Sequence, residues 1–290
     1  MSRVFLDLEQ AYCAQEGSRF AVVSVPFDAT STWKKGADRG PEAIIEASAH
    51  LELYDIETDS EAYRRGIYTD RGSLDLETPE RMVESVERAV GSFLSQGMIP
   101  VVLGGEHSVS IGAVRAAHAA HPELSVLQID AHTDLRDEFE GSRLNHACVM
   151  ARVTELCPAV QVGIRSMDAS ERVRFQRKRA FLAEEIVGRT GWEERAVELL
   201  SPSVYVTFDL DGLDPSIMPS TGTPEPGGLS WYESLRFLRL VAERRKIIGF
   251  DVVELCPGAD HASDFLAAKL VYKLMSYISA GEHAAYVTRP

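Results

Sequence analysis

The sequence predicts an α/β fold, a three-layer α-β-α arrangement with a mainly parallel central sheet. Short apolar runs alternate with longer amphipathic stretches along the chain, which is the pattern of strands connected by helices. Several apolar runs are continuous and rich in Val and Ile, as expected for parallel strands that helices cover on both faces. The chain has no internal repeat or linker-like tract, and its 290 residues suit one large domain, so a single domain over residues 1–290 is expected.

The predicted strands are the short apolar runs, and a late run is a candidate for the last strand of the sheet. They are Phe20–Pro26, Ile99–Gly104, Leu124–Ile129, Ala159–Ile164, Val204–Phe208, Ile247–Val253 and, as that late candidate, Ala284–Val287.

The predicted helices are amphipathic stretches between these runs. In Glu80–Gln96 the apolar residues recur close to every 3.6 positions, and the pair Thr78-Pro79 in front of it is typical of a helix start. Further helices are expected over Gly112–Ala120, Ser170–Arg179, Trp192–Leu200, Trp231–Glu243 and His261–Ser279.

Charge and composition exclude several classes of protein. The formal net charge is −14, and an acidic surface repels nucleic acid and anionic lipid, so neither is an expected partner. The first residues lack the apolar run of a signal peptide, and no window has the apolar length of a membrane span. The four cysteines show no CxxC spacing. We therefore expect a cytoplasmic protein.

Polar side chains gather where the predicted strands end, which is where ligands bind in folds of this class. In an extended chain alternate side chains share a face, so Asp130, His132 and Asp134 can converge on one point. The strand-end residues that point to chemistry are His107, Asp130, His132, Asp134, Asp209, Asp211 and Glu254.

The four aspartates in this set predict a binuclear metal site. Four carboxylates cannot lie close together without compensating positive charge, and neither aspartate motif contains a Lys or Arg. Two divalent cations would balance the four negative charges. The six Asp and His side chains are too many for one tetrahedral zinc, and mixed carboxylate and imidazole donors suit Mn²⁺, with Fe²⁺ or Co²⁺ as alternatives. A water held between two such ions ionises near neutral pH and becomes a nucleophile.

These motifs resemble the ureohydrolase family, which includes arginase, agmatinase, guanidinobutyrase and formimidoylglutamase. The segments that resemble its metal motifs are Gly104–Ser108, Asp130–Asp134 and Phe208–Pro215, and Thr221–Gly228 and Asp251–Glu254 match in the same order. The likeness extends from about Val22 to near the C-terminus, and several ordered motifs are far more specific than one. It implies the arginase-like fold and a homo-oligomer, a trimer or a hexamer.

The resemblance also implies a role for each matching residue. Two Mn²⁺ ions per subunit would be held by His107 and Asp134, by His132 and Asp211, and by Asp130 and Asp209 as bridges. Asp134 would in addition orient the attacking hydroxide, and Glu254 would anchor the guanidinium group in the paired geometry that carboxylates offer. Thr223 would line the guanidinium end of the site, and His146 matches the proton-shuttle histidine of the family.

The implied reaction is hydrolysis of a guanidinium group with release of urea. The run Leu135–Val149 resembles prokaryotic agmatinases, so agmatine, which would give putrescine in polyamine biosynthesis, is the first expectation. N1-aminopropylagmatine is the second, followed by guanidinobutyrate and other guanidino or formimidoyl compounds. Arginine is disfavoured because Arg136 stands where arginases have an asparagine.

The loop after Asp134 leaves the distal group of the substrate open. Arg136 would suit a substrate carboxylate, whereas Asp137, Glu138 and Glu140 would suit a second cation, and Asp168 is a further candidate for a distal amine. A self-neutralising surface turn is the alternative for this loop. A non-catalytic relative of the family is the alternative to an enzyme, and it is disfavoured because all six metal-ligand positions and Glu254 are present.

Overall fold

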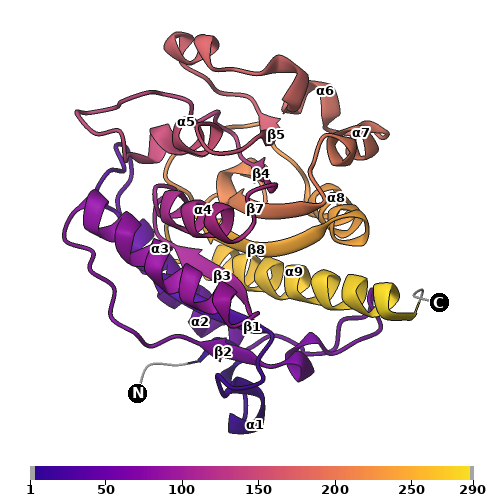
Figure 1. The fold of residues 1–290 in the computed structure, drawn as a ribbon. Helices are drawn as coiled ribbons and strands as arrows, with labels where there is room; N and C mark the ends of the chain where they lie inside the picture. Colours follow the sequence, from indigo (N-terminus) through magenta and orange to yellow (C-terminus); the bar gives the residue numbers. More distant parts are fainter. Residues whose placement is uncertain (1–3, 288–290) are drawn as a thin grey trace.

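The structure is a computed structural model that describes residues 4–287. Its centre is a sheet of eight strands in the order β2-β1-β3-β8-β7-β4-β5-β6, and every neighbouring pair is parallel (Figure 1). The strands are β1 (Phe20–Val25), β2 (Ile67–Thr69), β3 (Ile99–Gly104), β4 (Ser125–Ile129), β5 (Ala159–Ile164), β6 (Ala180–Leu182), β7 (Ser203–Asp209) and β8 (Lys246–Val253).

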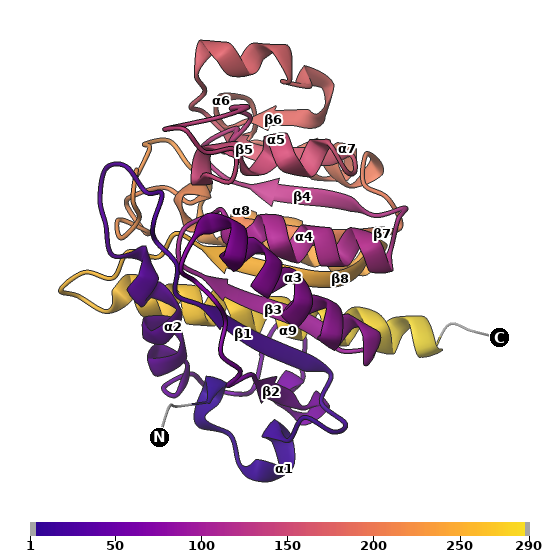
Figure 2. The same ribbon diagram turned by 60° about the vertical axis from the view of Figure 1, so that its left-hand side comes forward.

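Helices cover both faces of this sheet, so the predicted three-layer α/β fold is confirmed. The helices α3, α4 and α5 pack on one face, and α2, α7, α8 and α9 pack on the other, as Figures 1 and 2 show for the longer ones. The helices are α1 (Gln10–Cys13), α2 (Gly40–Ser48), α3 (Pro79–Ser95), α4 (Val109–Ala120), α5 (Val149–Thr154), α6 (Ala183–Ile186), α7 (Trp192–Glu198), α8 (Trp231–Arg244) and α9 (Ala262–Val287).

The continuous apolar runs are explained by the two buried faces of the sheet. In β3, Val101 and Leu103 belong to the core that α8 and α9 cover, whereas Val102 belongs to the core beneath α3 and α4. All three are fully buried, because successive side chains of a strand point to opposite faces and a helix layer excludes water from each.

The predicted start of α3 is confirmed. Thr78 is its N-cap and accepts a hydrogen bond from the Arg81 amide, and Pro79 occupies the first turn, where its missing N–H removes a donor that would lack a partner. In α8, Ser230 and Glu233 form a reciprocal capping box. No helix among residues 4–287 combines the length and the apolar character that crossing a membrane requires.

Two of the predicted elements are wrong. The run Ala284–Val287 is the end of α9 rather than a strand. The prediction failed because a short apolar run in a sequence does not distinguish a buried strand from part of a helix. Residues Ser170–Arg179 do not form one helix but two short 3-10 segments, Ala169–Val173 and Arg177–Arg179. Residues 174–176 are not helical and separate the two segments, and the chain enters the edge strand β6 at Ala180.

Candidate active site

The candidate site lies beyond the carboxyl ends of four neighbouring strands, β3, β8, β7 and β4. Residue pairing places one residue of each strand in a single row across the sheet, namely Leu103, Val252, Phe208 and Ile129. The polar side chains follow this row within a few residues, so segments as far apart as His107 and Glu254 meet. The strand register therefore builds the site.

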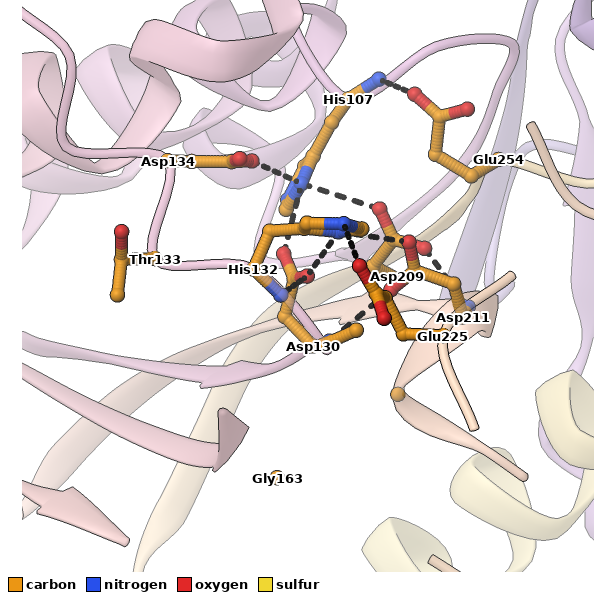
Figure 3. A network of polar contacts seen from close by, with 12 residues as sticks. His107, Asp130, His132, Thr133, Asp134, Gly163, Asp209, Asp211, Glu225 and Glu254 are labelled. Atoms are coloured by element: carbon orange, nitrogen blue, oxygen red, sulfur yellow. Dashed lines mark hydrogen bonds and ion pairs between the residues drawn. The ribbon is translucent and has the colours of Figure 1, made fainter. Parts of the chain in front are cut away.

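A first cluster surrounds His107. Its Nδ1 atom lies 2.9 Å from Oδ2 of Asp134, 3.2 Å from Oδ2 of Asp130 and 3.4 Å from Oδ2 of Asp209 (Figure 3). This nitrogen is buried without a hydrogen-bond partner among the described residues. A ring nitrogen that faces three carboxylate oxygens has the arrangement of a metal ligand set, and His107, Asp130 and Asp134 could hold one ion.

A second cluster surrounds His132. Its Nδ1 atom lies 2.9 Å from Oδ2 of Asp211 and 3.6 Å from Oδ1 of Asp130, and these three residues could hold a second ion. Asp130 thus presents one carboxylate oxygen to each cluster, as a bridging ligand would.

The clusters contain more negative charge than they can neutralise. Asp130, Asp209 and Asp211 are almost completely buried. Burial and the nearby Asp130 raise the pKa of Asp134 to about 7, and burial together with Asp211 holds the pKa of Asp209 well above its usual range. Two divalent cations would offset the four carboxylates, so these residues fit a binuclear centre.

Hydrogen bonds from behind orient the cluster residues. Oδ2 of Asp130 accepts a bond of 2.6 Å from Gln128, and Oδ1 of Asp211 accepts one of 3.0 Å from the Ala131 amide. On the far side of the His107 ring, Nε2 lies 2.8 Å from the Thr207 hydroxyl. Such outer partners set ring orientation and ligand direction.

Two residues of the site have a left-handed backbone, Asp134 with φ 51° and Glu254 with φ 68°. This conformation costs a side-chain-bearing residue about 1–2 kcal/mol. Backbone hydrogen bonds hold it: the Asp134 carbonyl accepts from the amides of Met150 and Ala151, and the Glu254 amide donates to the Gly105 carbonyl at 2.7 Å. Strain of this kind is typical of functional sites.

Glu254 lies beside the first cluster. Its Oε1 atom accepts a 2.8 Å hydrogen bond from the His107 amide, and burial and the neighbouring Glu106 raise its pKa well above the usual range. A Cβ on Gly222 would lie 3.3 Å from the other oxygen, Oε2, so the glycine leaves the space beside this carboxylate open.

A cavity of about 320 Å³ leads to both clusters, and every catalytic, substrate-binding and metal-binding candidate except the buried Asp130 lines it. His146 lies on its wall with Nδ1 3.2 Å from the Thr30 hydroxyl, and burial lowers its pKa to about 4. Thr223 lies on the exposed loop beside Gly222.

At the mouth of the cavity the charges are already paired. The Arg136 guanidinium stacks on the Phe139 ring at 4.6 Å and lies 3.6 Å from the Asp168 carboxylate. The same carboxylate accepts a hydrogen bond from the Ser170 amide. Asp137 contacts three arginines, Arg143, Arg152 and Arg174, and, like Glu138 and Glu140, is not among the lining residues. This segment is therefore better described as a self-neutralising surface loop than as a group of acidic residues that binds a second cation of the substrate.

Three residues of the site have no role in the sequence-based prediction. Glu171 is buried and accepts hydrogen bonds from the Thr133 hydroxyl and the Leu135 amide, so it ties the strand-end segment to the mouth. Glu106 and Thr30 contact each other behind the cavity wall. Of these three residues, only Glu106 could have been recognised from the sequence, because it stands next to His107 in the Gly-Gly-Glu-His motif.

Comparisons with known proteins agree with this geometry. Residues 18–276 match the model of the arginase family. An N(1)-aminopropylagmatine ureohydrolase of Synechocystis sp. is 40% identical over 285 residues, covering 94% of this chain and 93% of that protein. An agmatinase of Pyrococcus horikoshii is 33% identical over 276 residues, covering 92% and 94%. The crystal structure of the agmatine ureohydrolase of Thermoplasma volcanium superposes with a TM-score of 0.85 at 29% identity, covering 98% of this chain and 96% of that one.

Proposed function

The chain belongs to the arginase family, as its motifs predict, and we propose from this premise that it releases urea from N1-aminopropylagmatine. That it is a hydrolase of guanidino groups follows from the family, whereas the substrate, the metal and the residue roles are the proposal. The observation that carries it is the pair of His/Asp clusters sharing Asp130, with Glu254 beside them in one cavity.

We propose that the two clusters hold two Mn²⁺ ions. His107 and Asp134 would bind one and His132 and Asp211 the other, with Asp130 and Asp209 between them. Oxygen and imidazole donors without a thiolate favour Mn²⁺ over softer metals. When bound, such a pair supplies Lewis acidity and a water that ionises near neutral pH.

The carboxylate of Glu254 would bind the substrate. A guanidinium presents its N–H donors in one plane, and a carboxylate accepts two of them side by side. The His107 amide already orients Oε1, and Gly222 leaves room next to Oε2. A guanidinium bound in this way would have its carbon next to the two clusters.

Asp134 and His146 would move the protons. Hydrolysis takes a proton from the attacking water and delivers one to the amine nitrogen as its bond to the guanidinium carbon breaks. Asp134 lies in the first cluster and His146 on the wall of the same cavity, so each can exchange a proton with a group bound between them.

The mouth favours a long cationic substrate. Arg136 is paired with Asp168, so its charge is not free to bind the carboxylate of a guanidino acid. The exposed ring of Trp33, the ring of Phe139 and the side chain of Met167 line the outer cavity. Apolar walls suit methylene groups, and an aromatic face attracts an ammonium. N1-aminopropylagmatine has two amines beyond its guanidinium, and the relative named for it is more similar than the agmatinase.

Agmatine is the second candidate. Thr223, next to Gly222 on the cavity wall, would line the guanidinium end for either compound, and the two share that end. The similarity to the agmatine ureohydrolase structure, which covers almost the whole of both chains, supports it.

Urea release tests the proposal directly. The Mn²⁺-loaded protein is assayed in parallel with N1-aminopropylagmatine, agmatine, arginine, 4-guanidinobutyrate and formimidoylglutamate, and release of formamide from the last is followed separately. We expect the highest kcat/KM with N1-aminopropylagmatine. A preference for arginine or for 4-guanidinobutyrate, or no turnover by protein with two bound metal ions, would contradict the proposal.

We also propose that the chain acts as a homo-oligomer, a trimer or a hexamer, with residues 1–290 as one domain in each subunit. Light scattering after size-exclusion chromatography tests the assembly, because a mass three or six times the 32.0 kDa of one chain is expected. A cooperative single unfolding transition of each subunit would support the single domain.

A further inference from the structure

We propose that Glu106 and Thr30 position His146 and determine which of its two ring nitrogens carries the proton. The inference deepens the proposed ureohydrolase function and rests on it, because His146 would move protons in that reaction. His146 would be the residue in contact with the reacting groups, and Glu106 and Thr30 would act through it.

Glu106 is a fully buried carboxylate that collects hydrogen bonds from the loop in front of the cavity. Its Oε2 atom accepts a bond of 2.6 Å from the Thr30 amide, and its Oε1 atom accepts one of 2.7 Å from the Thr30 hydroxyl. The Ser108 hydroxyl also donates to Oε1, at 2.5 Å. A carboxylate only accepts hydrogen bonds, so it takes the single hydroxyl proton of Thr30.

With its proton directed at Glu106, the Thr30 oxygen faces His146 as an acceptor. It accepts the His146 backbone N–H at 3.0 Å and lies 3.2 Å from Nδ1 of the ring. Nδ1 must then carry a proton to make a favourable contact, and Nε2 on the other side of the ring has a free lone pair.

The ring is held in this orientation from a second direction. Phe139 packs edge-on against His146, with 6.2 Å between ring centroids. Burial keeps the ring neutral near pH 7, and a neutral imidazole has two tautomers, only one of which leaves Nε2 able to accept a proton. The contact with Thr30 selects that tautomer, so that Nε2 can take a proton from the attacking water and pass it to the leaving amine.

Removing the hydroxyl of Thr30 is the first test. In Thr30→Val we expect kcat for urea release to fall about 10- to 100-fold, the range for a lost outer partner of a site residue, with KM and metal content nearly unchanged. Thr30→Ser retains the hydroxyl and should recover most of kcat. Thr154→Val is the matched control, because that hydroxyl bonds only carbonyls of its own helix.

The tautomer of His146 is the second readout, and a purely structural role for Thr30 would not change it. Solid-state ¹⁵N NMR of histidine-labelled protein, loaded with diamagnetic Mg²⁺, separates protonated from unprotonated ring nitrogens, and His146→Asn identifies the signal among the eight histidines. We expect a protonated Nδ1 in the native chain and a loss of this preference in Thr30→Val. Glu106→Gln should reverse it, because an amide can donate to Thr30 and release its hydroxyl proton toward His146.

The outcomes separate the two proposals. A native His146 with the proton on Nε2, or a Thr30→Val variant that loses kcat while its tautomer is unchanged, overturns the inference and leaves the ureohydrolase function intact. Native kcat in Thr30→Val also overturns it. If the native protein releases urea from none of the guanidines, the proposed function fails, and the NMR signal still decides whether Glu106 and Thr30 orient the ring.

Discussion

The two ends of the cavity balance their charges in opposite ways. We call the end with the two His/Asp clusters the closed end, and the mouth is the end with Arg136 and Asp168. At the closed end, Asp130 and Asp211 are buried and have only histidines as ion-pair partners among the described residues. At the mouth, the Arg136 and Asp168 side chains are 30% and 42% exposed and pair with each other. Two histidines can offset at most half of the charge of four buried carboxylates, and an unbalanced buried charge is costly, whereas an exposed ion pair is close to neutral in energy. The closed end therefore needs added ions to be complete, and the mouth does not.

The largest expected effect tests whether the closed end is one unit. Asp130→Asn removes the carboxylate that both clusters share, so both ions should be lost together and kcat/KM should fall by more than the roughly 100-fold typical of outer partners. Metal analysis and urea release measure this. Asp260→Asn is the matched control, since this exposed residue only caps Ala262. Retention of one ion per subunit would show two independent sites.

Glu254→Gln separates substrate binding from metal binding at the closed end. The substitution keeps the size of the side chain but removes the charge that would bind the guanidinium, and a hydrogen bond to a charged group is worth about 1.5–3 kcal/mol. We expect kcat/KM to fall roughly 10- to 100-fold while two ions remain bound. Full activity in this variant would rule out the anchor role of Glu254.

A change in pH should affect the closed end and not the mouth. In the metal-free protein the pKa of Asp134 is raised to about 7, and Asp211 and Asp130 outweigh burial and raise the pKa of His132 to about 12. Both groups hold protons that a metal must displace, so Mn²⁺ affinity should rise with pH, by about tenfold per unit for each proton released. Calorimetry in buffers of different ionisation enthalpy counts these protons.

The pH series has its own control at the mouth. The pKa of Asp168 is lowered, mainly by hydrogen bonds from Ser170 and further by Arg136, so this carboxylate stays ionised throughout the same range. An affinity for Mn²⁺ that does not change with pH would contradict a closed end whose groups are protonated before the metal binds.

The smallest effect is expected at the mouth. Asp168→Asn removes the negative member of an exposed pair, so KM for N1-aminopropylagmatine should rise no more than about fivefold, the equivalent of roughly 1 kcal/mol, and kcat should stay constant. Agmatine, which is shorter, should respond less. Comparison of KM for both substrates measures the difference, and an equal rise for both would place Asp168 outside the distal subsite.

The parts of the molecule that could be predicted are those whose sequence pattern is contained in a few neighbouring residues. Asp130 and His132 stand directly after a buried apolar run, so their place at a strand end is readable. The edge strands β2 and β6 have three residues each and too little apolar pattern to be recognised. The hydrogen bonds between Thr30 and Glu106 join loops 76 residues apart. No sequence pattern near either residue predicts this contact.

The sheet order has a consequence for how the protein forms during synthesis. The last strand along the described chain, β8, lies between β3 and β7, so the β2-β1-β3 group and the β7-β4-β5-β6 group have no hydrogen-bonded connection until it inserts. His107 belongs to the first group and Asp130 to the second. The second cluster lies wholly in the β7-β4-β5-β6 group, whereas the first cluster takes His107 from one group and Asp130 and Asp134 from the other, so it is complete only after β8 has joined the two. Metal binding by the first cluster would therefore mark the point at which folding of the sheet is finished.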